Sequence, residues 1–343
     1  MKLFSLRILL NAAAALSLLV SASSCINVTP DSGDQAEHYI GFTSSVETKA
    51  PVGSAADMNE FAVWAAYYAD GTFDSEPMEG IRVYRRENGL WIYDNLQSWQ
   101  EGDWHFEAFY PHPSAFTVNE VQQGKDALKV TFTAQKTENP TGLEGLTVDY
   151  YYGPTASYDL MTAEADRSYP AQGGNAVQFT FSHLLSRVSI VVKTTTGDVT
   201  LNSLTFTGMS VLGAYNTFGY SGRWQLLTEF DELSDVPSGS FSDLNDNIPS
   251  PLPSDGTSVD VLSDLLLIPQ TPGDGTNGHA PITLEVTYAI GDAAPETKTI
   301  DLPSSTPWEP GHHYRYTLKL AMADVTLSVD MKPWNERNYT VIF

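Results

Sequence analysis

Apolar and polar residues alternate along most of the chain from about residue 39 onward. Val177, Phe179 and Phe181 are apolar, whereas the residues between them are polar. A period of two is typical of a β-strand that buries one face. The same alternation recurs over residues 282–288 and 314–320, and again over residues 325–331. No long segment carries a convincing period of 3.6 residues, so the pattern predicts an all-β chain.

Shorter candidate strands are separated by clusters of Gly, Pro, Asn and Asp, which are typical of turns. Parallel strands would need crossover helices, and the pattern shows none, so we expect antiparallel sandwiches. One sandwich holds about 100 residues. The 343 residues therefore indicate two tandem antiparallel β-sandwich domains. The additional candidate strands are residues 39–46, 61–68, 81–86, 90–93, 103–110, 128–134, 188–194, 199–207, 259–268 and 296–302.

Two irregular segments interrupt this rhythm. Residues 168–175 are rich in Gly and polar side chains and predict a boundary between an N-terminal domain, 38–172, and a C-terminal domain, 173–343. Residues 229–258 hold several acids among Pro and Ser and indicate a long surface loop. These acids lack the alternating oxygen-ligand spacing of a calcium loop, so we expect no metal site there.

Residues 1–24 have the organisation of a secretory signal peptide. Basic residues precede an apolar stretch, residues 8–20, and small residues then lead to Cys25. The apolar stretch is short of the roughly 20 residues that span a bilayer. Because Cys25 lies where a bacterial lipobox places its acylated cysteine, we predict lipidation there; a free thiol or plain cleavage nearby is the alternative. Residues 25–37 are polar and turn-rich, which predicts a tether.

The charge of the chain is strongly unbalanced. It has 42 acidic and 18 basic side chains, for a formal net charge of −24 at pH 7. This excess disfavours nucleic acid and anionic membrane surfaces as partners. The single cysteine excludes an internal disulfide framework and any zinc site that needs two thiolates.

Motifs that carry catalytic chemistry are weak or missing. The GxGxxG match at residues 273–278 leads into a strand, whereas a dinucleotide site needs a helix there. His312 and His313 are adjacent and would face opposite sides of a strand. His183 is interpreted as a satisfied, partly buried histidine. We therefore expect no enzyme and no cofactor. A catalytic pair of carboxylates across a cleft remains an open alternative, because the sequence alone does not show which acids face each other.

Aromatic residues suggest a second kind of function. Tyr150, Tyr151 and Tyr152 are consecutive, so at least one ring should point away from the core if the segment is extended. An exposed ring there could stack on a sugar. A glycan-binding surface lipoprotein that does not polymerise is therefore the alternative function.

A series of landmarks runs in order from the leader to the C-terminus. They are Ile40–Phe42, Glu47–Ala50, Phe61–Val63, Trp104–Pro111, Tyr158–Met161, Val177–Val188, Trp308–Tyr314 and Val329–Trp334. In order and spacing the chain resembles the fimbrillin family of Bacteroidales, the Mfa-like lipoproteins and type V pilins. The resemblance implies two transthyretin-like β-sandwich domains, a lipidated precursor, and trypsin-like cleavage that removes the lipid and the first strand. A strand from the next subunit then fills the groove by β-augmentation.

Mapped onto this sequence, the resemblance implies cleavage between Lys49 and Ala50, which would detach the strand at 39–46. Relatives commonly have Arg in place of this Lys. Two alternatives therefore remain open: cleavage by a protease that accepts Lys, and no cleavage at all. The strand at 324–332 is the donor candidate; its apolar face carries Val325, Leu327, Val329 and Met331. Both segments could instead be ordinary closing strands.

The resulting hypothesis is a subunit or adhesin of a fimbria, exported as a lipoprotein to the bacterial outer membrane and cell surface. Its expected partners are other fimbrial subunits, the outer membrane through the lipid before processing, and a ligand on a host or bacterial surface.

Overall fold

The structure is a computed structural model, in which the chain is built from β-strands as the alternation predicts. Nineteen strands, β1 to β19, form four sheets in the part of the chain that the structure describes. The prediction of an all-β fold is confirmed. The described residues are 39–46, 58–116, 127–136, 144–151, 158–170, 176–218, 224–226, 238–242, 244–272, 281–321 and 325–333.

The first sheet has seven strands in the order β1-β9-β8-β5-β2-β3-β4. Their bounds are β1 Gly41–Val46, β2 Glu60–Ala69, β3 Thr72–Arg85, β4 Trp91–Tyr93, β5 Gly102–Tyr110, β8 Met161–Tyr169 and β9 Ala176–His183. All seven strands contribute to one apolar cluster on the inner face. The sheet curls until its two edges meet. Where they meet, the Ile40 amide donates to the Gln97 carbonyl at 2.9 Å and the Tyr93 hydroxyl donates to the Ile40 carbonyl at 2.8 Å.

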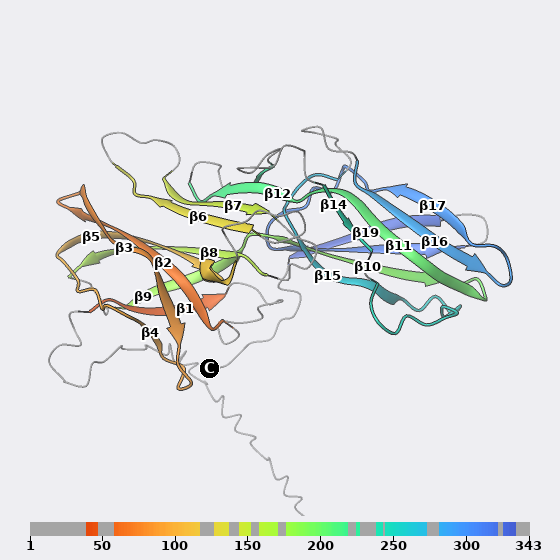
Figure 1. Cartoon of the computed structure of the whole chain (residues 1–343), viewed down its shortest axis with the longest axis horizontal. Coiled ribbons are helices and arrows are strands. Elements are labelled where there is room, and N and C mark those ends of the chain that lie inside the picture. Colours follow the sequence, from red (N-terminus) through yellow and green to blue (C-terminus); the bar gives the residue numbers. More distant parts are fainter. Residues whose placement is uncertain are drawn as a thin grey trace, which may run out of the picture.

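The second sheet covers part of the outer face of the first. Its strands are β6 Ala127–Thr133, β7 Gly145–Tyr151, β12 Leu212–Asn216 and β13 Trp224–Leu226, in the order β13-β12-β7-β6. Ala62 and Trp64 of β2 and Phe109 of β5 share an apolar cluster with Leu146 and Val148 of β7. As a result, β2 is buried on both faces, and Figure 1 shows β6, β7 and β12 layered above the first sheet.

The third and fourth sheets form the other half of the molecule, at the right of Figure 1. The third sheet has the order β15-β10-β18-β19 and the fourth has the order β14-β11-β16-β17. Val188 and Ile190 of the third sheet and Phe206 and Leu284 of the fourth lie in one buried cluster. The bounds are β10 Ser186–Thr194, β11 Val199–Ser210, β14 Ser238–Phe241, β15 Val259–Leu267, β16 Thr283–Ile290, β17 Glu296–Asp301, β18 His312–Leu320 and β19 Val325–Pro333.

Two strand pairs depart from the expected antiparallel pairing. β1 pairs with β9, and β10 pairs with β18, in parallel. Neither connection is a single crossover helix, since other strands lie between the partners in the sequence. The expectation that parallel pairing needs helices therefore fails at these two places, although the remaining ladders are antiparallel.

The chain passes from the first half to the second through a buried link of two residues, Leu184 and Leu185, between β9 and β10. It returns to the first half through the buried Val211, between β11 and β12. The Leu184 amide donates to the Leu160 carbonyl, the Trp224 indole donates to the Leu184 carbonyl at 2.7 Å, and the Gly311 amide donates to the Leu185 carbonyl at 2.9 Å.

Strands from both sides of residue 172 share sheets. β9 lies in the first sheet, and β12 and β13 lie in the second. The boundary at 172/173 stays a prediction for a division into folding units.

Candidate functional site

The inner face of β1 is seated in the core of the first sheet. Ile40 and Phe42 are 0% and 1% exposed. The Phe42 ring lies 5.4 Å from the Tyr93 ring, 5.8 Å from Phe179 and 6.3 Å from Phe106, measured between centroids. Burying each of these two side chains stabilises the fold by about 1.5–3 kcal/mol. The first strand therefore acts as an apolar plug in the sheet that it borders.

Ser44 is a polar residue on the same inner face. It pairs with Phe179 in the parallel ladder, and Phe42 pairs with Val177. The Ser44 hydroxyl oxygen is buried without a hydrogen-bond partner. A buried, unpaired hydroxyl costs about 1–3 kcal/mol. Two large side chains, Ile40 and Phe42, thus stabilise the plug in its seat, whereas the unsatisfied hydroxyl of Ser44 destabilises it.

β1 has a regular ladder on one side only. That ladder is with β9. Toward β4, the backbone is held by the two hydrogen bonds of Ile40 and an isolated bridge between Tyr39 and Ser98, beside the ring contact of Phe42 with Tyr93. The connection from β1 to β2 contains Lys49 and Ala50, and both lie outside the described residues, as does Cys25.

β19 is also an edge strand and packs more loosely than β1. It forms an antiparallel ladder with β18 alone, from the pair His312 and Pro333 to the pair Leu320 and Val325. Val325, Leu327 and Val329 are half-buried against the core, and Met331 is 49% exposed. The predicted donor residues therefore share one face that is only partly covered.

The predicted glycan contact falls on buried side chains. Tyr150 is 0% and Tyr151 is 5% exposed. The Tyr150 ring lies 6.3 Å from Phe116 and 6.4 Å from Trp224, between centroids. Neither of these two rings offers the open face that stacking on a sugar requires, and Tyr152 lies outside the described residues.

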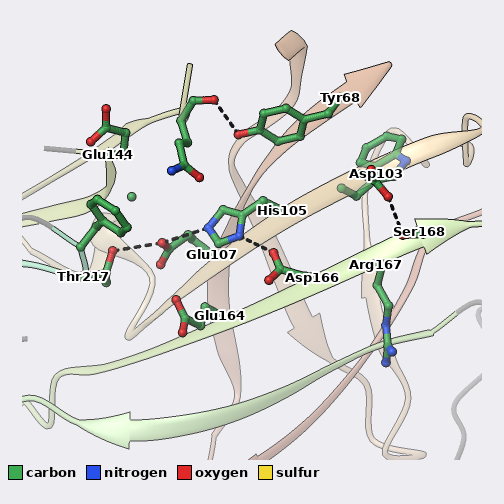
Figure 2. A pocket seen from close by; sticks show the side chains of 14 residues that line it. Tyr68, Asp103, His105, Glu107, Glu144, Glu164, Asp166, Arg167, Ser168 and Thr217 are labelled. Carbon is green, nitrogen blue, oxygen red and sulfur yellow. Dashed lines mark hydrogen bonds and ion pairs between the residues drawn. The ribbon is translucent and has the colours of Figure 1, made fainter. Parts of the chain in front are cut away.

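A charged pocket of about 590 Å³ opens on the outer face of the first sheet, at the edge of the second sheet, where Glu144 and Thr217 contribute to its wall (Figure 2). Its floor is made by alternate residues of two paired strands, where His105 faces Asp166 and Glu107 faces Glu164. Along the same face of β5, Phe109 lies under the second sheet and the charged residues follow where that cover ends. The remaining lining residues are Tyr68, Asp103, Trp104, Gln135, Gly145, Arg167, Ser168 and Phe218.

His105 is held between two carboxylates. Its Nδ1 lies 2.7 Å from Asp166 Oδ1, and its Nε2 lies 3.2 Å from Glu107 Oε1. Burial alone would lower the pKa of His105, but the hydrogen bonds and charges of Glu107 and Asp166 outweigh it and raise this pKa from 6.5 to about 9. The ring is therefore an imidazolium at neutral pH.

Glu107 connects the first sheet to the second. It is 2% exposed, and burial raises its pKa, partly offset by His105. The Thr217 hydroxyl donates to Glu107 Oε1 at 3.0 Å and accepts from the Leu146 amide at 2.9 Å. The other carboxylate oxygen, Oε2, is buried without a hydrogen-bond partner.

This arrangement is an ion-pair network and lacks the order of a catalytic relay. Both ring nitrogens of His105 face carboxylates, so the protonated ring has no lone pair with which to act as a base. The nearby hydroxyls are also engaged, because Ser168 donates to Asp103 at 2.5 Å and Thr217 donates to Glu107. His183, in turn, is buried against Asp159 at 2.8 Å.

Two negative findings apply to the described residues. Among them, no group of three or more His, Cys, Asp and Glu side chains is arranged to hold a metal ion. Within the same residues, no helix has the length and apolar character needed to cross a membrane.

The chain belongs to the fimbrillin-like family, whose pattern matches residues 48–334. Membership places it among proteins of fimbriae and the cell surface, a structural class. No curated protein matches the chain in sequence.

Solved structures resemble the chain over most of its length. A fimbrial protein from Bacteroides vulgatus is 18% identical, with a TM-score of 0.59, and the match covers 87% of this chain and 99% of that one. A candidate cell adhesion protein from Bacteroides ovatus is 18% identical, with a TM-score of 0.50 and coverage of 86% and 97%. At this identity, the likeness shows a shared fold.

Proposed function

We propose that the protein is a structural subunit of a cell-surface fimbria, without catalytic activity, that assembles by strand addition. In this proposal it is exported as a lipoprotein acylated at Cys25 and anchored in the outer membrane. Cleavage between Lys49 and Ala50 then frees the plug strand. Family membership and the seating of β1, with Phe42 1% exposed in the core of a sheet that it merely borders, support the proposal.

The groove under β1 suits a second strand of similar pattern. Without β1, the exposed wall would include Val177, Phe179 and Phe181 of β9, which are fully buried in the intact chain. An added strand would regain backbone hydrogen bonds along β9 and place alternate side chains against this wall. Because the contact joins unlike surfaces of successive subunits, it extends into a filament.

β19 matches the requirements for the added strand. Its four apolar residues recur every second position, as do the inward positions 40, 42 and 44 of the plug. A donor strand would place an apolar side chain where Ser44 now leaves a hydroxyl unsatisfied. Exchange therefore replaces a plug with one polar defect by a strand without one, which favours assembly.

Two reversible crosslinks test the proposal. The pair Thr43→Cys and Gln178→Cys joins register partners of β1 and β9, and the pair Thr317→Cys and Ser328→Cys joins partners of β18 and β19. We expect each oxidised pair to block polymerisation of protease-treated subunits and each reduced pair to restore it. As a control, the pair Thr287→Cys and Thr297→Cys joins β16 to β17, and should leave polymerisation unchanged in both states.

The outcomes separate the two roles. Polymerisation that continues with β1 locked refutes strand exchange at this groove. Polymerisation that stops with β1 locked but continues with β19 locked removes only the donor assignment. Mass spectrometry of the mature N-terminus tests processing: a chain that begins at Ala50 supports it, and assembled fimbriae that retain acylated Cys25 contradict it.

A further inference from the structure

The charged pocket is separate from the groove used for strand addition. In β5, Trp104 and Phe106 face the inner core that surrounds Phe42. His105 and Glu107 alternate with them and face the opposite side of the sheet. Replacement of β1 would therefore leave the pocket in place, and the pocket needs an explanation of its own.

The pocket carries a surplus of negative charge. Five carboxylates line it, from Asp103, Glu107, Glu144, Glu164 and Asp166. The cations on the lining are His105 and Arg167. Figure 2 shows the Arg167 side chain directed away from the carboxylates, and its guanidinium donates to the Ala176 carbonyl at 3.4 Å. Among the described residues of the lining, His105 is thus the cation that faces this carboxylate group.

Two of these carboxylates lie directly opposite one another on the floor. Glu107 and Glu164 are register partners of β5 and β8 (Figure 2), and like charges in that arrangement destabilise a sheet. Glu107 adds an oxygen, Oε2, that is buried and lacks a donor. A cation with several hydrogen-bond donors would relieve this repulsion, because it neutralises the exposed Glu164 beside the buried Glu107.

The shape of the pocket narrows the choice of cation. A volume of about 590 Å³ lies in the range of small-ligand sites and far exceeds a single metal ion. Tyr68 and Phe218 contribute aromatic surface to the wall, and Phe218 is 57% exposed. Aromatic faces suit an aliphatic chain that ends in a cation. Carboxylates on two sheets suit a compact ammonium, whose three donors are not confined to one plane.

We propose that this pocket binds a primary ammonium group on a flexible aliphatic chain, either a lysine side chain of a partner protein or a free diamine. The ammonium sits over the floor between Glu107 and Glu164, and the chain leaves past the aromatic wall.

Calorimetric titration of the full mature chain tests this site with two probes. One is the diamine cadaverine; the other is the peptide acetyl-Gly-Lys-Gly-amide, with its Nε-acetylated form as the uncharged comparison. We expect binding of at least one charged probe, no binding of the acetylated peptide, and weaker binding at higher salt. Glu164→Gln should weaken binding about tenfold, as expected for loss of one charge-assisted hydrogen bond.

The control variant is Glu285→Gln, which removes an exposed carboxylate from β16, outside the pocket, and should keep the affinity unchanged. Equal melting temperatures of the two variants show that Glu164→Gln still folds. Binding of the peptide alone assigns the site to a partner's lysine, and binding of cadaverine alone assigns it to small amines; both support an ammonium site. No binding of either charged probe at millimolar concentration, or equal affinity of the Glu164→Gln variant, overturns the proposal.

Discussion

The free energy that holds β1 in the sheet can be probed at Ser44, whose hydroxyl is unsatisfied. In the closed state the hydroxyl is buried without a partner, whereas opening of β1 returns it to water. Ser44→Ala removes this penalty of about 1–3 kcal/mol and leaves a small void, so we expect a net gain of about 1 kcal/mol in the free energy of opening. That gain corresponds to about fivefold slower exchange.

Hydrogen exchange measured by mass spectrometry on peptides that cover residues 39–46 reads this opening directly. Thr43→Ala is the matched control, because Thr43 is the neighbouring residue of the same strand and is half-buried on the outer face; its effect should stay within about 0.5 kcal/mol. Cleaved Ser44→Ala subunits should also polymerise more slowly than the parent. Exchange in Ser44→Ala that is equal to or faster than that of the parent would refute the orphan-hydroxyl argument.

Phe42→Ala should lower the opening free energy of β1 by about 3–5 kcal/mol and greatly speed its hydrogen exchange; unchanged exchange would contradict the plug assignment. The folded-state pKa of His105 is raised from 6.5 to about 9, so its stabilisation is fully present below about pH 6.5 and is lost as pH rises through about 9. The difference in melting temperature between the parent and His105→Gln should therefore shrink toward pH 9, and a constant difference would argue against the ion-pair network. Gln270→Leu should destabilise the second half by about 2–4 kcal/mol in denaturant titrations, because the Ser210 amide and carbonyl both lose their partner; a change below about 0.5 kcal/mol would show that water replaces it.

Strands can be located from the sequence where one face is buried and the other is exposed to solvent. β9 and β16 bury alternate residues, and both were predicted from that alternation. β12 was missed because nearly every residue in it is buried, which erases the period of two. β8 was missed for a different reason: Glu164, Asp166 and Ser168 face the pocket, opposite small alanines, so its apolar contrast is weak.

The charged pocket could not be predicted because its contacts join distant segments. Glu107 and Thr217 are 110 residues apart in sequence, and His105 and Asp166 are 61 apart. The segment Trp104–Pro111 served only as a family landmark, since nothing local reveals which strands neighbour it. A weak local signal does exist: charged residues at positions 103, 105 and 107 alternate with apolar ones, which places them together on one face of a strand.

The two-residue link between β9 and β10 has a mechanical consequence for a filament. If a neighbouring subunit's strand lies along β9, any tension on it enters β9, crosses Leu184 and Leu185, and continues into β10, which is paired in the third sheet with β18. β18 in turn carries β19, the strand that would reach the following subunit. Both link residues are buried, and their backbone groups are hydrogen-bonded to segments of both halves, so the load passes through a rigid connection. A fimbria built this way should resist stretching within each subunit, unlike a filament whose domains are joined by flexible linkers.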